Sequence, residues 1–479
     1  MVEEKPKGVA GVPKAEDKST SDIDSSVEEV SDFELRGLSL VLVFVGLALA
    51  VFLMSLDSAI ISTAISRITS QFNSTGDIGC FPMKGMFLGC LAVLQLGSLL
   101  CALAVNSPML IVGRAIAGAG AAGCCTGGFC IVAVSLPLEK RPFAVAILQS
   151  SFGIATIIGP LLGGAFTQHS TWRWCFWINL PLGAVTILTL VFFFNPPSRN
   201  STKVSLILHR LESLDLLGAI FFAPAVIMIL LAVQWGGTEY AWKSATIIGL
   251  FIGGAGLGVI FAFWQVYRGE KAMIPPRLFT NRMMFFACFA EFFALGAVCI
   301  SIYYIPEWFQ VVKNASPATS GVMYLPLALS DVLSTIIAGA SLKYLGYPNL
   351  YILFGTALMS IATGLFPTFT TTTPHQHWIP FQALQGLGAG MTMSMPYVAT
   401  QIILKPEDIP VGTSLLQCLQ FFGAAVSLAV AEATFENRLV SGLASSGYTE
   451  EAIENFINAG STSVRSVVPK CVRITTPSR

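Results

Sequence analysis

The chain has 479 residues, of which 54% are hydrophobic and 11% are charged, and its mean hydropathy is +0.71. So few charges, against roughly 25% in soluble domains, exclude water as the solvent for most of the chain. The 27 basic and 27 acidic side chains balance, so charge does not indicate a nucleic acid partner. We therefore expect an integral membrane protein whose partners are lipid and the compounds that cross it.

Residues 1–37 are polar, contain an acidic cluster, and show no cleavable signal peptide. They cannot bury enough apolar surface to fold alone, which predicts a disordered tail. A helix that crosses the hydrocarbon core needs about 20 mostly apolar residues, and lipid cannot hydrogen-bond an exposed backbone. The rest of the chain therefore predicts an all-α membrane fold with twelve spans, approximately over 38–66, 86–105, 109–136, 143–166, 172–194, 214–235, 245–267, 284–311, 318–343, 348–369, 378–404 and 411–433.

Lysine and arginine in the loops predict the orientation of these spans. Alternate loops, beginning with the one at residue 137, together hold eleven lysines and arginines. The loops between them together hold two, Lys243 and Lys313. Basic short loops face the cytoplasm, so the first set is cytoplasmic. Counting back through the twelve spans from these loops places residues 1–37 outside the cell, where an acidic tail without a signal peptide is unusual. Either the tail is translocated, or a crossing helix is missing between the first two spans.

Two spans carry the same glycine pattern. Arg114 and Gln382 are each followed by glycines four and six residues later. A repeat of this kind indicates two duplicated bundles with a substrate site near the midplane between them. The alternative is that small residues recur in any membrane bundle because they let helices approach closely.

The span over 143–166 contains a proline among glycines. Proline kinks a helix, and the glycines let a neighbouring helix pack against the bend. Here the chain resembles the drug:proton antiporters of the major facilitator superfamily, whose fifth helix carries this pattern. The matching residues are Gly153, Gly159, Pro160, Gly163 and Gly164.

Three further segments resemble the fungal fourteen-helix branch of these antiporters. Residues 172–183, rich in tryptophan, resemble the start of its sixth helix, and Gly113 with Arg114 matches its fourth-helix motif. Residues 56–61 are similar to its first-helix motif, although an alanine stands where threonine is usual. The resemblance covers about residues 38–468.

The resemblance implies fourteen helices, of which this chain lacks the second and the last, so about twelve are present. Restoring both would place both termini in the cytoplasm, which removes the conflict over orientation. The implied organisation is a cytoplasmic tail over 1–37, an N-terminal bundle over 38–194, a linker with two extra helices over 195–267, a C-terminal bundle over 268–433 and a polar tail over 434–479.

Charged residues inside the spans are the candidate functional groups, because a charge in a membrane helix costs at least ~2.5 kcal/mol and is usually retained for function. The resemblance implies proton coupling for Arg114, whose alternative is an interfacial side chain that reaches water. Asp57 is either a second proton carrier or a helix-end anchor. Glu291, Asp331 and Gln382 are candidates for the substrate cavity.

The remaining motifs concern the loops. Asn73 and Asn314 begin glycosylation sequences in loops that the resemblance places outside. His375 and His377 lack a third ligand at metal-binding spacing, so we expect no metal site.

Together these features predict a secondary transporter rather than an enzyme, since no catalytic constellation is present. We expect a monomer in the plasma membrane, without cofactor, that exports small hydrophobic organic compounds in exchange for protons by alternating access. The alternative is a truncated, non-transporting relative or an incomplete gene model of such a pump.

Overall fold

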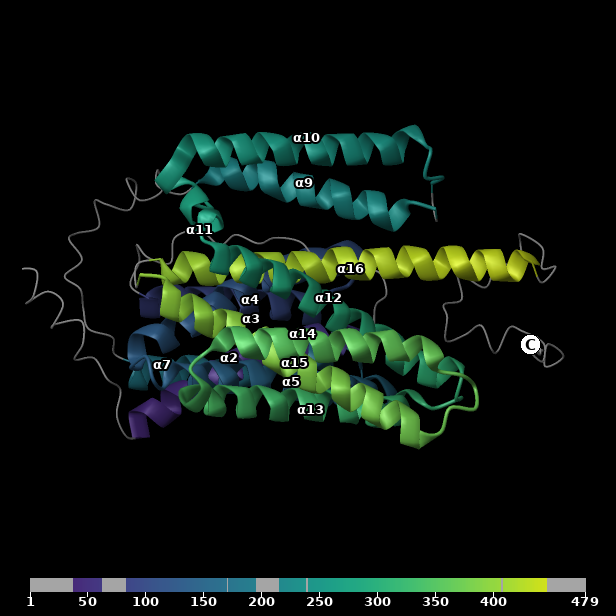
Figure 1. Cartoon of the computed structure of the whole chain (residues 1–479), viewed down its shortest axis with the longest axis horizontal. Coiled ribbons are helices and arrows are strands. Elements are labelled where there is room, and N and C mark those ends of the chain that lie inside the picture. Colours follow the sequence, from purple (N-terminus) through teal and green to yellow (C-terminus); the bar gives the residue numbers. More distant parts are fainter. Residues whose placement is uncertain are drawn as a thin grey trace, which may run out of the picture.

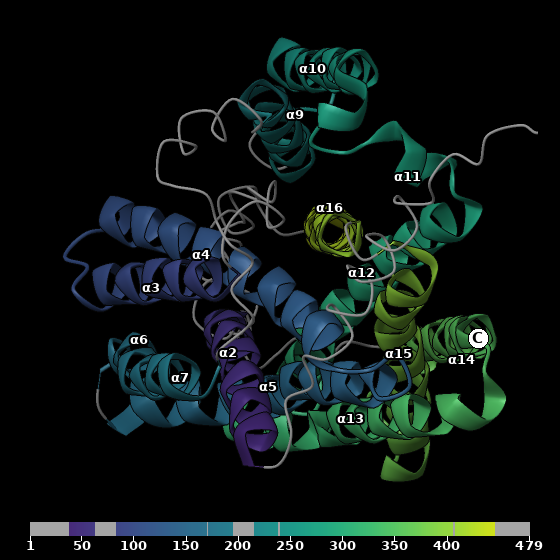
Figure 2. The same ribbon diagram turned by 90° about the vertical axis from the view of Figure 1, so that its left-hand side faces the viewer.

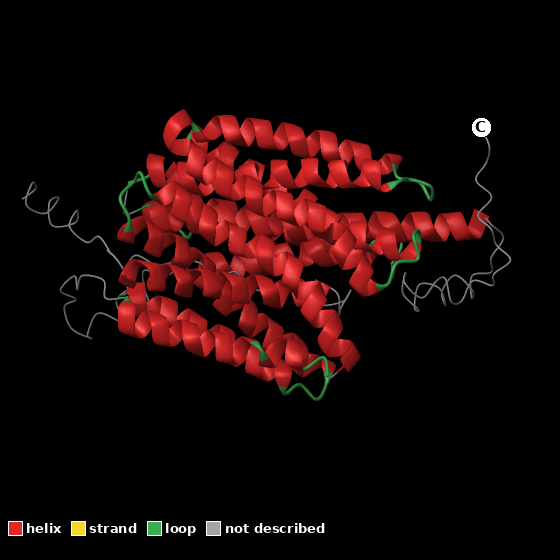
Figure 3. Ribbon diagram, turned by 90° about the horizontal axis from the view of Figure 1, so that it is seen from below, coloured by secondary structure: helices red, strands yellow, loops and turns green. Residues whose placement is uncertain are grey.

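The computed structural model describes residues 38–62, 83–169, 171–194, 215–237, 240–405 and 408–445. Over these residues the regular structure is helical, apart from an isolated bridge between Gly236 and Tyr240 (Figure 3). Ten helices in this part of the chain are long and apolar enough to cross a membrane. The predicted all-α membrane fold is therefore confirmed.

Each of the twelve predicted spans coincides with helical structure. The helices are α2 (Leu38–Ser62), α3 (Met83–Ala102), α4 (Ser107–Ser135), α5 (Arg141–His169), α6 (Trp174–Trp177), α7 (Asn179–Phe193), α9 (Leu216–Trp235), α10 (Ala245–Arg268), α11 (Pro276–Thr280), α12 (Arg282–Val311), α13 (Pro317–Leu345), α14 (Pro348–Leu365), α15 (His375–Ile403) and α16 (Ile409–Ser445).

Two of the twelve predicted spans are not among the helices that are long and apolar enough to cross a membrane. In α2 the apolar stretch is the shorter Val41–Leu53, and α15 does not qualify. Helix α15 packs against α12, α13, α14, α16 and α5, and its glutamines Gln382, Gln385 and Gln401 are buried. Because protein rather than lipid surrounds α15, its polar side chains do not face hydrocarbon.

The helices form two sets with a separate hairpin beside them (Figures 1 and 2). Helices α2 to α7 make the N-terminal set, and α12 to α16 make the C-terminal set. The sets contact each other through α5 with α13, α5 with α15, and α4 with α16. Helices α9 and α10 pack on each other and reach the rest of the molecule mainly through α9 and α16.

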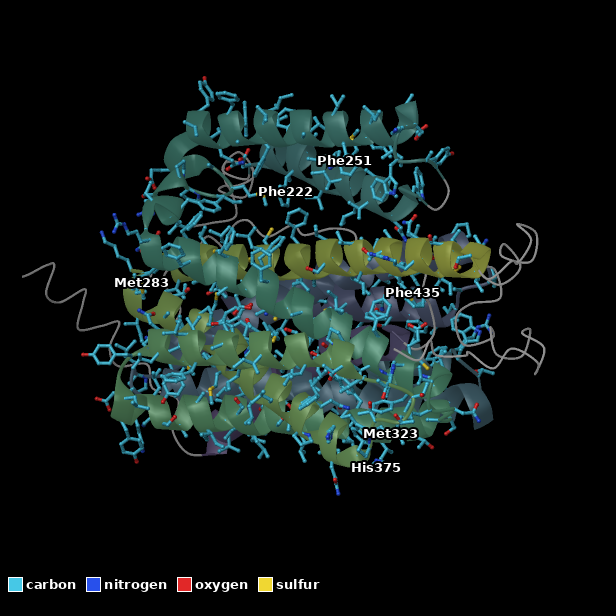
Figure 4. All side chains as sticks on the ribbon, turned by 45° about the vertical axis from the view of Figure 1, so that its right-hand side comes forward. Phe222, Phe251, Met283, Met323, His375 and Phe435 are labelled. Atoms are coloured by element: carbon cyan, nitrogen blue, oxygen red, sulfur yellow. The ribbon has the colours of Figure 1, made fainter. Side chains whose placement is uncertain are left out.

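The described loops among those predicted to be cytoplasmic meet at one end of the molecule, which we call the basic end. Arg277 in α11 pairs with Asp408 before α16 at 2.6 Å, and Asn349 in α14 donates to the sulfur of Met283 at 3.5 Å. Met283 marks this end in Figure 4, whereas His375 lies at the opposite end.

The end of α2 and the start of α3 lie at opposite ends of the N-terminal set. Gly46, near the start of α2, packs against Thr189 of α7. Lys84, at the start of α3, donates to the carbonyl of Val191 on the same part of α7 at 2.8 Å. The rest of α2, up to Ser62, adds about 24 Å at 1.5 Å per residue. Both helices therefore begin at the same end, and the orientation conflict found in the sequence is located between them.

Helix α16 is longer than predicted. It continues to Ser445 and projects beyond the other helices (Figure 1). The expected polar tail over 434–479 therefore begins as a continuation of this helix, and its residues 446–479 lie outside the described part of the chain.

Candidate functional site

A central cavity lies between the two helix sets. Its volume is about 650 Å³ with the open mouth included. Helices α4 and α5 supply one wall, and α12, α13, α15 and α16 supply the other. The lining residues are Cys125, Gln149, Phe152, Gly153, Thr156, Leu295, Val298, Ile302, Tyr324, Leu327, Ala328, Asp331, Thr335, Met393, Gln420 and Phe421.

Asp331 is the one carboxylate among these lining residues, and Gly153 lies opposite it. Asp331 is midway along α13, which puts it near the centre of the helix bundle. A Cβ atom added at Gly153 would lie 3.1 Å from Asp331 Oδ2 and 2.6 Å from Val332 Cγ2. The missing side chain at Gly153 therefore leaves room beside the carboxylate. Two predicted site residues are brought together here.

The rest of the proline motif extends away from this contact along α5. The helix runs from Arg141 through His169, and Gly159 is buried. The surroundings of Pro160, Gly163 and Gly164 lie outside the described residues. Of the two motif residues that are described, Gly153 lines the cavity and Gly159 does not.

Glu291 is buried in α12 without exposure to solvent. Neither of its carboxyl oxygens has a hydrogen-bond partner among the described residues. Gln420 is the neighbouring polar side chain, and it also lines the cavity, so Glu291 lies one side chain behind the cavity wall. Burying an ionised carboxylate without a partner is very unfavourable. The neutral, protonated carboxyl therefore fits this site.

Gln382, the third cavity candidate, is fully buried in α15 and does not line the cavity. Its amide nitrogen and oxygen have no hydrogen-bond partner among the described residues. One turn on, Gln385 donates to Ser301 Oγ of α12 at 2.6 Å. The two glutamines therefore place polar groups in the interior of the C-terminal set.

Arg114 lies partly buried in the first half of α4. Arg114 and Glu432 of α16 are both within electrostatic reach of Tyr303 of α12. The candidate proton-coupling arginine thus faces the C-terminal set. Asp57 belongs to α2, and its side chain lies outside the described residues.

The two sets are joined by a group of side chains near the basic end, which we call the inner seal. Phe129 of α4 stacks on Tyr397 of α15, with ring centroids 4.4 Å apart. Thr126 donates to Gln417 Oε1 of α16, and Gln401 Nε2 donates to the carbonyl of Phe129 at 3.5 Å. The inner seal therefore consists of Thr126, Phe129, Tyr397, Gln401 and Gln417.

The apolar core shows the same asymmetry between the two ends. The cluster that contains Phe129 and Leu148 also contains Met395 and Leu416, so it joins both sets. At the opposite end, the buried residues around Phe176 all belong to the N-terminal set and those around Phe309 all belong to the C-terminal set, although the partly buried Ile157 of α5 packs against the latter. The cavity is therefore closed toward the basic end.

Two glycosylation candidates were predicted in the loops. Asn314 is exposed in the connection between α12 and α13, at the end opposite the basic end. Its φ of 59° is left-handed, a conformation that asparagine tolerates better than most residues. Asn73 lies outside the described residues.

Comparison with known proteins identifies the family. Residues 78–428 match the sequence profile of the Major Facilitator Superfamily. The chain belongs to the Major Facilitator Superfamily. The resemblance inferred from the motifs is thereby confirmed at the level of the superfamily.

Several fungal members of this superfamily are similar over most of the chain. The "MFS-type transporter poxA" of Penicillium oxalicum is 41% identical over 90% of this chain and 81% of its own length. The "MFS-type efflux pump MFS1" of Arthroderma benhamiae is 38% identical over 98% and 90%, and "Efflux pump roqT" of Penicillium rubens is 39% identical over 89% and 83%. These relatives are transporters, so this superfamily member is a multi-pass membrane transporter and not an enzyme.

The sequence did not predict the inner seal of this transporter. Its members are common residue types in apolar helices, and the hydrogen bonds that join them connect residues nearly 300 positions apart. A weak signal was present, because glutamine is rare in lipid-facing helices and Gln401 and Gln417 therefore indicate contacts with protein.

Proposed function

We propose that the chain is a proton-coupled exporter of small hydrophobic organic compounds in the plasma membrane of a fungal cell. The central cavity carries this proposal, because it lies between two helix sets and is lined mainly by apolar side chains with one carboxylate, Asp331. The names of two similar proteins, both called efflux pumps, point the same way. A cavity of this composition favours hydrophobic cargo with a positive charge or a hydrogen-bond donor.

The mechanism that fits this architecture is alternating access. The two sets rock about the cavity, so that it opens to the basic end or to the opposite end but not to both. In the structure, the inner seal closes the cavity toward the basic end. Cargo leaves from this arrangement toward the outside.

Proton coupling is assigned to Arg114 and Asp57, as the resemblance to drug:proton antiporters implies. The support from the structure is that Arg114 of α4 and Glu432 of α16 both lie within electrostatic reach of Tyr303 of α12. An arginine that competes with a proton for a carboxylate makes the affinity for that proton depend on which way the bundle opens.

The experiment is an efflux assay in yeast that expresses the chain, with rhodamine 6G as a hydrophobic cationic probe. We expect cells that express the chain to retain less rhodamine than cells without it. Cells that express Arg114→Ala should retain as much rhodamine as cells without the chain. Glu139→Gln, which neutralises an exposed carboxylate between α4 and α5, is the control and keeps the efflux. Equal rhodamine in cells with and without the transporter would contradict the proposal.

A second candidate function follows from the connection between α2 and α3. We propose that the chain derives from the fourteen-helix branch and lacks a crossing helix at this point, because the described ends of α2 and α3 lie at opposite ends of the bundle. Such a chain would be a non-transporting relative or an incomplete gene model. Sequencing the transcript across residues 63–82 decides this: an additional stretch of about 20 apolar codons identifies an incomplete gene model of an active pump.

The remaining proposals concern the state of the protein in the cell. We propose a monomer that needs no cofactor and carries glycan on Asn314, whose side chain is exposed on the side opposite the basic end. Treatment with an N-glycosidase should shift the mobility of the wild-type chain by more than that of Asn314→Gln, and equal shifts would contradict a glycan on Asn314.

A further inference from the structure

Glu291 lies at the level of the inner seal. It is nine residues from the start of α12 at the basic end, about 14 Å along the helix. Tyr397 is six residues from the end of α15 at the same end of the molecule. Tyr397 lies within electrostatic reach of Glu291, and its hydroxyl donates to Gln420 Oε1 at 2.7 Å. The carboxyl group therefore adjoins the side chain that closes the seal.

The closed seal leaves this carboxyl group with few donors. Tyr397 directs its only hydroxyl proton to Gln420, and the buried oxygens of Glu291 make no hydrogen bond of normal geometry among the described residues, although the Gln420 side chain lies within reach. This environment accepts a protonated carboxyl and strongly disfavours a carboxylate. The closed arrangement of the seal is thus compatible with only one of the two protonation states.

Ionisation of Glu291 would act directly on the seal. A carboxylate needs more donors or water, and the polar side chain within its reach is Gln420, which accepts the hydroxyl proton of Tyr397. Drawing Gln420 toward an ionised Glu291 disturbs its hydrogen bond with Tyr397, and the Tyr397 ring is stacked on Phe129 of the other helix set. Loss of the proton therefore separates the stacked rings and lets water enter from the basic end.

We propose that Glu291 is a proton-binding site that couples the cytoplasmic gate to pH: closing the inner seal takes up one proton at Glu291, and opening it releases one. This proposal rests on the proposed proton-coupled export and adds the residue that links the proton to the gate. Gln420 separates Glu291 from the cavity by one side chain, so a proton in the cavity has a short way to the carboxyl group.

Few other titratable groups surround Glu291. Cys288 lies one turn away on α12, and Tyr397 faces it from α15. Cys418 of α16 lies within electrostatic reach of Cys288, and Cys125 of α4 lies within electrostatic reach of Tyr397. Thiols and a phenol are uncharged near neutral pH, so Glu291 is the group in this cluster whose charge changes with the gate.

The test measures the gate without any substrate. Lys140→Cys and Lys405→Cys place spin labels on exposed positions of the two sets at the basic end. Distances between the labels in lipid nanodiscs are measured by double electron–electron resonance from pH 5.5 to 8.5. Labelling of the chain without these two substitutions gives the background from its native cysteines.

We expect one short distance at low pH and a longer one that grows as pH rises. For one proton, the ratio of open to closed molecules rises up to tenfold per pH unit. Glu291→Gln, which mimics the protonated side chain, should remain short at every pH, and Glu291→Asp should restore the dependence. A pH response in Glu291→Gln equal to that of the parent, or no response in the parent, would overturn the proposal.

The proposed export is tested separately by rhodamine 6G transport with the same proteins in liposomes. A gate that depends on Glu291 in a protein that moves no rhodamine would refute the proposed function and leave the gate intact. Transport of rhodamine by a protein whose gate does not depend on Glu291 would refute the gate proposal and support the proposed function.

Discussion

Two carboxylates in the interior of this transporter differ in what they can meet. Asp331 lines the central cavity opposite Gly153, whereas Glu291 is enclosed behind Gln420 at the inner seal. Under the proposed function, cargo meets the first and a proton binds the second. The same residue chemistry therefore serves two different roles, and its position relative to the seal decides which.

The largest effect should come from filling the space beside Asp331. Gly153→Val places a branched side chain against Val332 and the Asp331 carboxylate, where a Cβ alone is already at 2.6 Å from Val332. We expect rhodamine 6G efflux to be lost almost completely. Gly256→Val is the matched control, since nothing lies within 4 Å of a Cβ at that position of α10. Unchanged efflux in Gly153→Val would show that cargo does not pass Asp331.

Removing the charge of Asp331 should have a smaller effect that depends on the cargo. A hydrogen bond or charge contact with an ionised group contributes about 1.5–3 kcal/mol, so Asp331→Asn should lower the efflux of cationic rhodamine about tenfold or more. A neutral hydrophobic probe should be transported as before. Equal losses for both probes would mean that Asp331 acts on the proton and not on the cargo.

The inner seal can be weakened without touching either carboxylate. Stacked aromatic rings contribute about 0.5–1.5 kcal/mol beyond their buried area. In the spin-labelled protein, Phe129→Ala should raise the ratio of open to closed molecules by about threefold or more, and it should weaken the pH dependence, because Glu291 acts on the gate through this stack. A pH dependence equal to that of the parent would show that Glu291 does not act through the stacked rings.

The smallest effect on transport is expected at Asp215, outside the spans. Desolvation raises the pKa of Asp215, but hydrogen bonds from Trp264, Met273, Gly218 and Gln265 lower it by more, so the net shift is below its ordinary value. A lowered pKa stabilises the fold at pH values above the pKa of aspartate in the unfolded chain, which is near 4. This stability is lost as the pH falls through the pKa of Asp215 in the folded protein.

Asp215→Asn should therefore unfold at a lower temperature than wild type at pH 7 and lose this difference at strongly acidic pH. Thermal unfolding of the purified protein in detergent measures both. Efflux should be nearly unchanged, because Asp215 joins α9 to α10 and to the segment before α11, away from the cavity. A large loss of efflux would show that the α9–α10 hairpin takes part in transport.

The sequence predicted the helices of this fold better than their contacts. Lipid imposes a length and an apolar composition on each span, so helix α12 or α13 is visible in the sequence alone. Helix α15 was predicted from its length although protein surrounds it. The extension of α16 to Ser445 was missed because its last turns contain polar residues such as Asn437.

The candidate site was predicted in parts. Gly153 and Asp331 were each singled out, one as part of a family motif and the other as a charge in a span, but only the packing of α5 on α13 shows that they face each other. Glu291 was recognisable as an intramembrane acid. Its enclosure behind Gln420 and its relation to Tyr397 depend on three helices meeting, which no local pattern in the sequence records.

The most direct test of the account uses purified protein in liposomes with an imposed proton gradient. Proton movement in one direction should drive rhodamine 6G in the other, and Arg114→Ala should remove the dependence on the gradient. Rhodamine movement at the same rate with and without the gradient would contradict proton-coupled export by this transporter.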